Sequence, residues 1–111
     1  MENGEKYIIK KTKDNEVLVK FLAPMDSFEW NKFTSMLVRM LKNGFLKWKF
    51  ILTEQQIATS VDIGMLVSCN ATINSYKGEL VIIVLEGSTI HKTLVFTKLD
   101  KILNISLLKK N

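Results

Sequence analysis

Short polar side chains stand at three points where the pattern of apolar residues predicts the start of a helix. In chain order they are Asp26, Ser27, Thr59, Ser60, Asp62 and Ser88. A hydroxyl or carboxylate at such a point caps unpaired backbone N–H groups, which is worth about 1 kcal/mol. The same point tolerates a phosphate, because the helix dipole favours negative charge there. The sequence therefore leaves two roles open for Ser60: a helix cap and the acceptor of a reversible phosphorylation.

The single histidine and the single cysteine offer little further chemistry. His91 has no nucleophile or carboxylate at the spacing of a catalytic triad, and Cys69 lies beside an apolar stripe, as a packing residue would. One cysteine and one histidine do not make up the ligand set of a structural zinc. Gly87, Ser88 and Thr89 lack the glycine spacing and the lysine of a phosphate-binding loop. We expect no catalytic residue, no metal and no cofactor.

Length and composition predict one globular domain over residues 1–111. The chain is 47% hydrophobic and 24% charged, and its 111 residues are too few for two independent cores. No apolar run approaches the roughly 18 residues that span a bilayer, and the charged first residues are unlike a secretion signal. We expect a cytoplasmic protein without membrane insertion.

The basic residues are spread along the chain and form no nucleic-acid-binding motif. The formal net charge is +5, and Arg39 is the only arginine. Arginine is the side chain that binds phosphate or guanine through two parallel hydrogen bonds. We therefore expect no nucleic-acid partner.

The chain opens with a hairpin and then alternates between helices and apolar strands. The hairpin pairs Tyr7 to Lys11 with Glu16 to Leu22 across a turn. The first helix should begin with a capping box between Asp26 and Glu29. The later segments are helix 27–43, strand 48–52, helix 60–76, strand 80–85, helix 89–98 and strand 103–107.

Each helix should bury one stripe of side chains. The expected inward residues are Trp30, Phe33, Leu37, Met40 and Leu41 in the first helix, Ile63, Leu66, Val67, Asn70 and Ile73 in the second, and Ile90, Leu94 and Val95 in the third.

The order ββαβαβαβ predicts an α/β fold with a mixed sheet, in which parallel strands follow the antiparallel hairpin. Strand 80–85 is apolar on both faces. We expect it at the centre of the sheet, beside the two apolar strands before it and covered by helices. Ligands bind such sheets at the carboxyl ends of the strands, which here are loops 23–27, 53–60 and 86–89.

Four segments carry a resemblance to a known family. Residues 22–26 (LAPMD) stand where the family has Leu-x-Gly-x-Leu-Asp, with alanine for the glycine, and residues 77–81 (KGELV) match its Gly-Gly-x-Leu-x pattern. Residues 93–102 (TLVFTKLDKI) match its ending Leu-x-x-x-Gly-Leu-Asp-x-x-hydrophobic, with Lys98 for the glycine. Residues 59–66 (TSVDIGML) match its signature Asp-Ser-Ser/Thr-Gly and the Leu-Gly-Val-Leu that follows. On these segments the chain resembles the STAS domain of bacterial anti-sigma factor antagonists, which also occurs in sulfate transporters.

The resemblance implies a STAS-like single domain, here with a C-terminal helix that is short or absent. It also implies a phosphorylation site, because in the family a partner kinase phosphorylates the serine after the signature aspartate, which is Ser60 here. Thr59 replaces that aspartate, and Asp62 replaces the glycine and would repel a phosphate. A second register, two residues later, puts Gly64 on the glycine and Asp62 on the acceptor, and leaves no hydroxyl to phosphorylate.

Two functions follow from the resemblance. The first is a non-enzymatic module that binds an anti-sigma factor or a related serine kinase and is switched by phosphorylation at Ser60. The alternative is a constitutive scaffold or transport-system subunit with the same fold and no phosphoswitch. The sequence leaves open whether the chain forms a homodimer. The expected partner-binding residues are Asp26, Ser27, Thr59, Ser60, Asp62 and Ser88.

Overall fold

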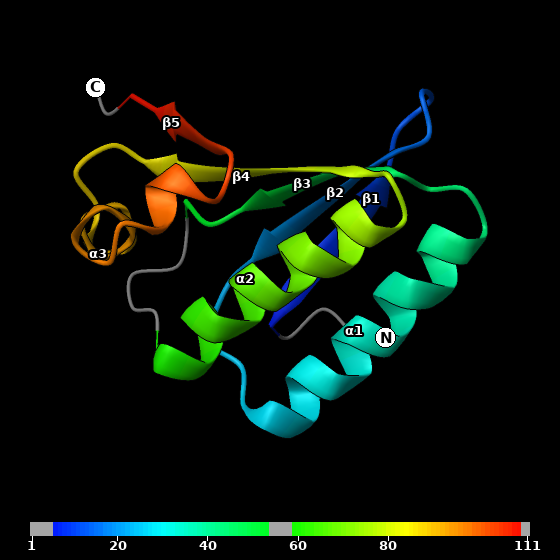
Figure 1. Ribbon diagram of the computed structural model, residues 1–111, viewed down its shortest axis with the longest axis horizontal. Helices are drawn as coiled ribbons and strands as arrows, with labels where there is room; N and C mark the ends of the chain where they lie inside the picture. Colours follow the sequence, from blue (N-terminus) through cyan, green and yellow to red (C-terminus); the bar gives the residue numbers. More distant parts are fainter. Residues whose placement is uncertain (1–5, 54–58, 110–111) are drawn as a thin grey trace.

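A computed structural model describes residues 6–53 and 59–109, which build one five-stranded sheet and its helices (Figure 1). The elements in chain order are β1 (Tyr7–Lys11), β2 (Glu16–Phe21), α1 (Ser27–Lys42), β3 (Lys47–Ile51), α2 (Ser60–Ser75), β4 (Glu79–Leu85), α3 (Thr89–Phe96), the 3-10 turn η2 (Leu99–Lys101) and β5 (Ile105–Leu108). Strands β1 and β2 are antiparallel, and every later neighbour is parallel. The predicted mixed α/β sheet is confirmed.

The strand order corrects one prediction. The sheet runs β1-β2-β3-β4-β5, so β3 is its middle strand, and β4 lies between β3 and β5. The expectation that strand 80–85 is central and adjoins both earlier apolar strands is wrong. Each crossover instead places the new strand beside the previous one.

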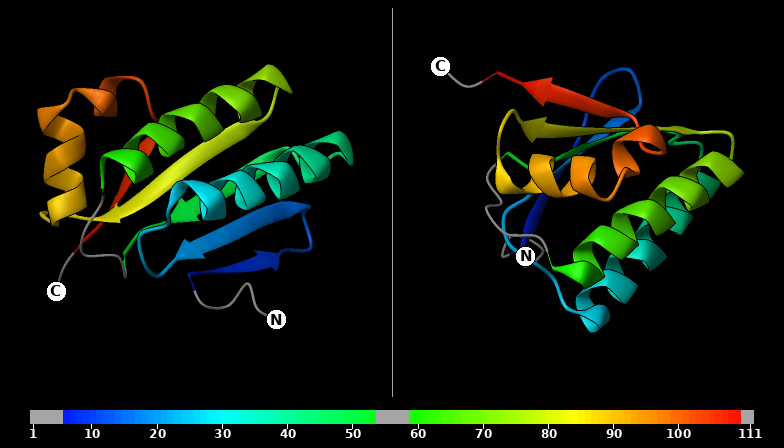
Figure 2. Two further views of the ribbon diagram at one scale, coloured as in Figure 1. Left: turned by 90° about the horizontal axis from the view of Figure 1, so that it is seen from below. Right: turned by 60° about the vertical axis from the view of Figure 1, so that its left-hand side comes forward.

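The helices cover one face of the sheet, as both views in Figure 2 show. Side chains that alternate along each strand are buried on this face. They are Val17, Val19 and Phe21 in β2, Trp48 and Phe50 in β3, and Leu80, Ile82 and Val84 in β4. The intervening residues of β4, such as Val81 and Ile83, are only half-buried. The prediction that helices cover both faces of this strand is therefore wrong, because no helix among the described residues covers the second face.

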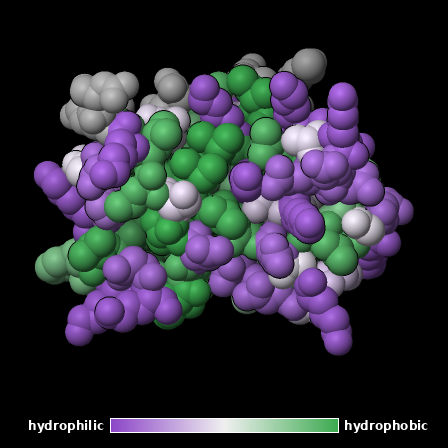
Figure 3. All heavy atoms as spheres, turned by 90° about the horizontal axis from the view of Figure 1, so that it is seen from above, coloured by the Kyte–Doolittle hydropathy of each residue, from purple (hydrophilic) through white to green (hydrophobic). Residues whose placement is uncertain are grey.

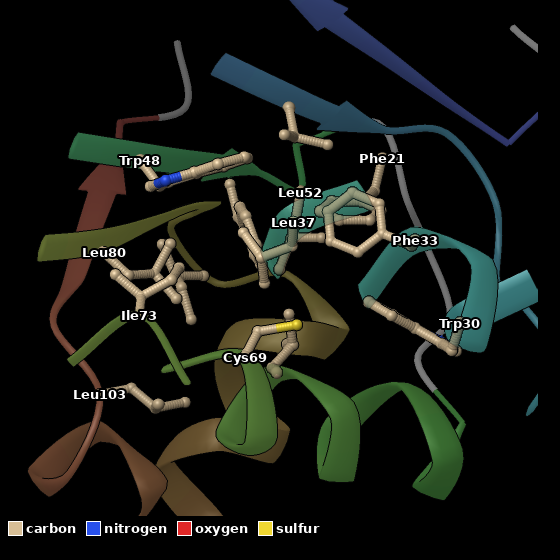
Figure 4. Close-up of a cluster of buried hydrophobic side chains, with 14 of the residues drawn as sticks. Phe21, Trp30, Phe33, Leu37, Trp48, Leu52, Cys69, Ile73, Leu80 and Leu103 are labelled. Atoms are coloured by element: carbon tan, nitrogen blue, oxygen red, sulfur yellow. The ribbon is translucent and has the colours of Figure 1, made fainter. Parts of the chain in front are cut away.

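An aromatic cluster forms the core between α1 and the sheet (Figure 4). The rings of Phe21 and Phe50 lie 5.2 Å apart, and that of Phe33 lies 5.5 Å from both Phe21 and Trp30. Trp30, Phe33, Leu37 and Leu41 are buried as predicted, whereas Met40 is half-buried. Edge-to-face contacts of this kind add to the free energy gained from burying aromatic area.

The buried stripe of α2 differs from the predicted one. It consists of Asp62, Leu66, Cys69 and Ile73, whereas Ile63, Val67 and Asn70 are half-buried. Apolar residues occur around most of this helix, so their spacing alone could not select the inward face. The polar contacts of Asp62, described below, hold the observed rotation.

Two elements near the C-terminus are displaced from their predicted bounds. Helix α3 ends at Phe96, and Val95 is 48% exposed, although it was expected to face inward. Lys98 has a left-handed backbone with φ of 62°, which ends helical geometry and starts η2. Strand β5 consequently begins at Ile105, two residues later than expected. Within residues 6–53 and 59–109, none of the helices has the length and apolar character to cross a membrane.

Candidate functional site

The predicted polar residues lie at the starts of the helices, where Asp26, Thr59 and Ser88 cap backbone N–H groups. At α1 the Asp26 carboxylate accepts a hydrogen bond from the Glu29 N–H at 2.8 Å, and Glu29 Oε1 accepts one from the Asp26 N–H at 3.0 Å. This is the predicted capping box. Ser27, the first residue of α1, is exposed.

A second capping box starts α2. Thr59 is the N-cap, and its hydroxyl oxygen accepts a hydrogen bond from the Asp62 N–H at 3.1 Å. Ser60 is the first helical residue and is exposed, and no hydrogen bond of its side chain is found with any described residue. Thr59 therefore performs the capping that the sequence could have given to either residue. The Ser60 hydroxyl remains available to solvent.

Asp62 joins the two helix starts. Its Oδ1 accepts hydrogen bonds from the Met25 N–H at 3.1 Å and the Trp30 indole N–H at 2.9 Å. Its Oδ2 accepts from the N–H and the hydroxyl of Thr59, at 3.1 and 3.0 Å. The residue is 4% exposed, so its carboxylate stabilises the junction of α1 and α2 instead of lying on the surface. Charge-assisted hydrogen bonds to several donors compensate for burying a carboxylate.

An open hollow of about 380 Å³ lies between these two helix starts. It contains Lys6, whose ammonium group donates hydrogen bonds to the Pro24 carbonyl at 3.2 Å and to Glu29 Oε1 at 3.4 Å. The residues lining it are Lys6, Pro24, Met25, Asp26, Glu29, Thr59 and Val61. The structure thus brings together loop 23–27 and the start of α2. Residues 54–58 of the predicted loop 53–60 lie outside the described residues.

Two exposed apolar side chains in the first turns of α1 and α2 were missed by the sequence analysis, and of these Val61 lines the hollow and Phe28 does not. Phe28 is 68% exposed beside Ser27, and Val61 is 41% exposed beside Ser60. Phe28 falls outside the predicted stripe of α1, so its helical position was the signal that could have marked it as a surface residue. Exposed aromatic residues of this kind are frequent energetic centres of protein interfaces.

Ser88 is separate from this group of residues. It is the N-cap of α3, and its hydroxyl oxygen accepts a hydrogen bond from the His91 N–H at 3.1 Å. His91 Nδ1 accepts one from the Gly87 N–H at 2.9 Å. Neither residue lines the hollow beside Thr59. Both stabilise the turn that leads from β4 into α3.

The remaining candidate for reactive chemistry is enclosed in the core. Cys69 is fully buried, and this burial raises the pKa of its thiol from 9.0 to about 12. A thiol that stays protonated is a poor nucleophile and a poor metal ligand. Among the described residues, no three of His, Cys, Asp and Glu are grouped as a metal site would require.

Comparison with solved structures identifies the fold. A protein from Thermotoga maritima assigned as an anti-sigma factor antagonist superposes with a TM-score of 0.75 at 19% identity, over 95% of this chain and 86% of that one. The chain has the STAS fold of anti-sigma factor antagonists. The unphosphorylated form of the antagonist SpoIIAA superposes with a TM-score of 0.67 at 11% identity, over 95% of this chain and 89% of that one.

An anti-sigma factor antagonist from Mycobacterium paratuberculosis is also similar, with a TM-score of 0.71 at 13% identity, over 90% of this chain and 83% of that one. No protein-family model matches the sequence, and no curated protein matches it. At these identities the likeness concerns the STAS fold alone.

Proposed function

We propose that this chain is a non-enzymatic regulator of the anti-sigma factor antagonist type. It binds an anti-sigma factor or a related serine kinase at the surface formed by the starts of α1 and α2. The exposed hydroxyl of Ser60 carries this proposal, because it lies at a helix N-terminus between Thr59 and Val61, which both line the hollow, and Phe28 adds exposed apolar surface at the start of α1. Such a surface offers a partner both apolar contact and a site whose charge can change.

Phosphorylation of Ser60 is compatible with the carboxylate two residues away. Asp62 was expected to repel a phosphate, but its carboxylate is held inside the protein by hydrogen bonds from Met25, Trp30 and Thr59. The hollow lined by Thr59 and Val61 holds Lys6, which is paired with Glu29, and the carboxylate of Asp26. The positive end of the helix dipole at the start of α2 favours the roughly 1.5 to 2 negative charges that a phosphate adds. The first register of the family signature, with Ser60 as acceptor, is favoured because the second uses the buried Asp62.

Incubation with ATP and each purified serine kinase encoded near the gene tests the switch. We expect one phosphate on Ser60 by tandem mass spectrometry and none on Ser60→Ala. Ser88→Ala is the matched control, because it removes a serine from another helix start and should leave the labelling unchanged. Labelling that persists in Ser60→Ala would contradict the assignment of the acceptor.

Binding to purified anti-sigma factors from the same organism tests the surface. Phe28→Ala should weaken the complex at least about tenfold, as loss of a central aromatic residue does. The control Phe96→Ala removes an 88% exposed phenylalanine from α3 and should have no effect. Equal affinity of both variants with wild type would exclude this surface.

The second candidate function is a constitutive scaffold or transport-system subunit. The replacement of the signature aspartate by Thr59 favours it, because Thr59 and Asp62 form a capping box that needs no modification. In that case Ser60→Asp and wild type bind the partner equally. In the switch, Ser60→Asp weakens binding.

A further inference from the structure

The face of the sheet opposite the helices carries an apolar area bordered by lysines. Figure 3 views this face and shows hydrophobic side chains gathered over one part of it, with hydrophilic ones around them. We call it the outer sheet face. By strand register its apolar residues are Ile8, Leu18, Ile51, Val81, Ile83, Leu85 and Leu108, and its lysines are Lys10, Lys20, Lys47 and Lys49.

The apolar part is centred on β4. Ile83 pairs with Ile51 of β3 on one side and with Ser106 of β5 on the other. Leu85 pairs with Leu108, which is 51% exposed. Alternation along β4 places these side chains away from the core that α1 and α2 cover. A contiguous apolar patch on a sheet is a feature that proteins normally bury against a further layer.

The charged part lies mainly over β1 to β3. Lys10 pairs with Leu18, and Leu18 with Lys49, whose ammonium group lies 3.4 Å from Glu16 Oε2. Lys47, the first residue of β3, pairs with Glu16 of β2 on one side and with Glu79 of β4 on the other. Lysine outnumbers glutamate on this face, so it carries net positive charge beside its apolar part.

We propose that the outer sheet face binds an acidic amphipathic helix of a partner protein. The apolar stripe of such a helix would lie on Ile83 and its neighbours, with its carboxylates toward Lys10 and Lys49. A helix about 10 Å wide covers two to three strands spaced about 4.8 Å apart, which matches the width of the apolar part. Charge complementarity disfavours a second copy, which would bring lysines of the same sign to the contact. The apolar side chains are mostly half-buried and reach too little beyond the sheet for membrane insertion.

Two synthetic helical peptides test the proposal on the intact chain. Both carry the same leucine stripe, and their flanking positions are all glutamate in one and all lysine in the other. We expect the glutamate peptide to bind at least about tenfold more tightly in low salt, and to shift the amide NMR signals of β3 to β5. Equal affinities, no binding, or shifts confined to α1 and α2 would overturn the proposal.

Matched variants locate the contact. Ile83→Glu, and Ile83→Ser if the glutamate impairs folding, should reduce binding of the glutamate peptide at least about tenfold. Phe96→Glu removes an exposed apolar residue from α3 and should leave it unchanged. Lys10→Glu combined with Lys49→Glu should make the lysine peptide the tighter ligand. Ser60→Ala should not change binding of the glutamate peptide. Failure of the proposed function at Ser60 would therefore be distinguishable from failure of the proposal for the outer sheet face.

Two further outcomes would replace the proposed occupant. A dimer in sedimentation experiments that Ile83→Glu dissociates would assign the face to a second copy of the chain. Stronger binding to phosphatidylserine vesicles than to the glutamate peptide, lost in Ile83→Glu, would assign it to a lipid surface. Either result overturns the proposal of a helical partner.

Discussion

The indole N–H of Trp30 donates a hydrogen bond to the Asp62 carboxylate at 2.9 Å, between residues that stand 32 positions apart in the chain. Both side chains are almost completely buried, at 2% and 4% exposed. The same carboxylate contacts the backbone of Met25 and caps the helix that Thr59 starts. One side chain thus holds together the two helix starts that form the candidate site.

Replacing Asp62 by alanine should therefore destabilise the fold. The change leaves the buried donors of Trp30 and Met25, and the part-buried donors of Thr59, without this acceptor, at a cost of about 3 kcal/mol or more. Urea unfolding followed by circular dichroism measures this cost. Asp100→Ala is the control, because Asp100 is exposed and should change the free energy of unfolding by less than about 0.5 kcal/mol. Equal midpoints for the two variants would show that the Asp62 contacts contribute little.

The sequence predicted where polar residues stand but not what Asp62 does. The sequence indicated that Asp62 binds a partner and would repel a phosphate on Ser60. Burial depends on the indole of Trp30 approaching from another helix, and this long-range contact leaves no local pattern. Periodicity predicted α1 correctly because its apolar residues form one stripe, and it failed for α2 because apolar residues surround that helix.

The strand order was likewise beyond local pattern. Apolar residues on both faces of β4 indicated a central strand with two covered faces. In the structure one face is covered by helices and the other is the half-exposed outer sheet face. A sequence that leaves apolar residues for a partner is indistinguishable, by composition alone, from one that buries them within its own chain.

Two glycines of the chain should respond oppositely to alanine. A methyl group on Gly78 would lie 2.5 Å from the Leu46 carbonyl oxygen and 2.9 Å from Cγ2 of Ile73, whereas one on Gly64 meets nothing within 4 Å. Gly78→Ala should cost about 1–3 kcal/mol through overpacking. Gly64→Ala, inside α2, should gain about 1 kcal/mol through helix propensity. Thermal unfolding of both variants checks this, and a shift of the same sign in both would contradict it.

Two lysines occupy positions where the family patterns have glycine. Lys77 and Lys98 have φ of 63° and 62°, in the left-handed region that glycine adopts without strain. Lys77→Gly and Lys98→Gly should each stabilise the fold by about 0.5–1 kcal/mol, because relief of strain exceeds the added chain entropy. Lys92→Gly, inside α3, is the matched control and should cost about 1 kcal/mol. Destabilisation of all three variants in urea titrations would argue against left-handed backbone at the two positions.

The buried thiol of Cys69 should be unreactive in the folded protein. Burial raises its pKa from 9.0 to about 12, so the thiol of the unfolded chain ionises first as the pH rises. The stability gained from the protonated thiol is complete below pH 9.0 and is lost between pH 9.0 and about 12. Iodoacetamide at pH 9 should label Cys69 in 8 M urea and scarcely label it without denaturant. Equal labelling rates would show that the thiol is accessible in the folded state.

The two hydroxyls at the start of α2 should differ in their contribution to stability. Thr59→Ala removes the acceptor for the Asp62 N–H and a donor to the Asp62 carboxylate, and should cost about 1–2 kcal/mol. Ser60→Ala removes a hydroxyl for which no hydrogen bond with a described residue is found, and should change the free energy of unfolding by less than about 0.5 kcal/mol. Urea unfolding of both variants separates the cap from the proposed acceptor. If Ser60→Ala proved as costly as Thr59→Ala, the serine would be part of the cap, and a phosphate there would have to break the start of α2 instead of adding to it.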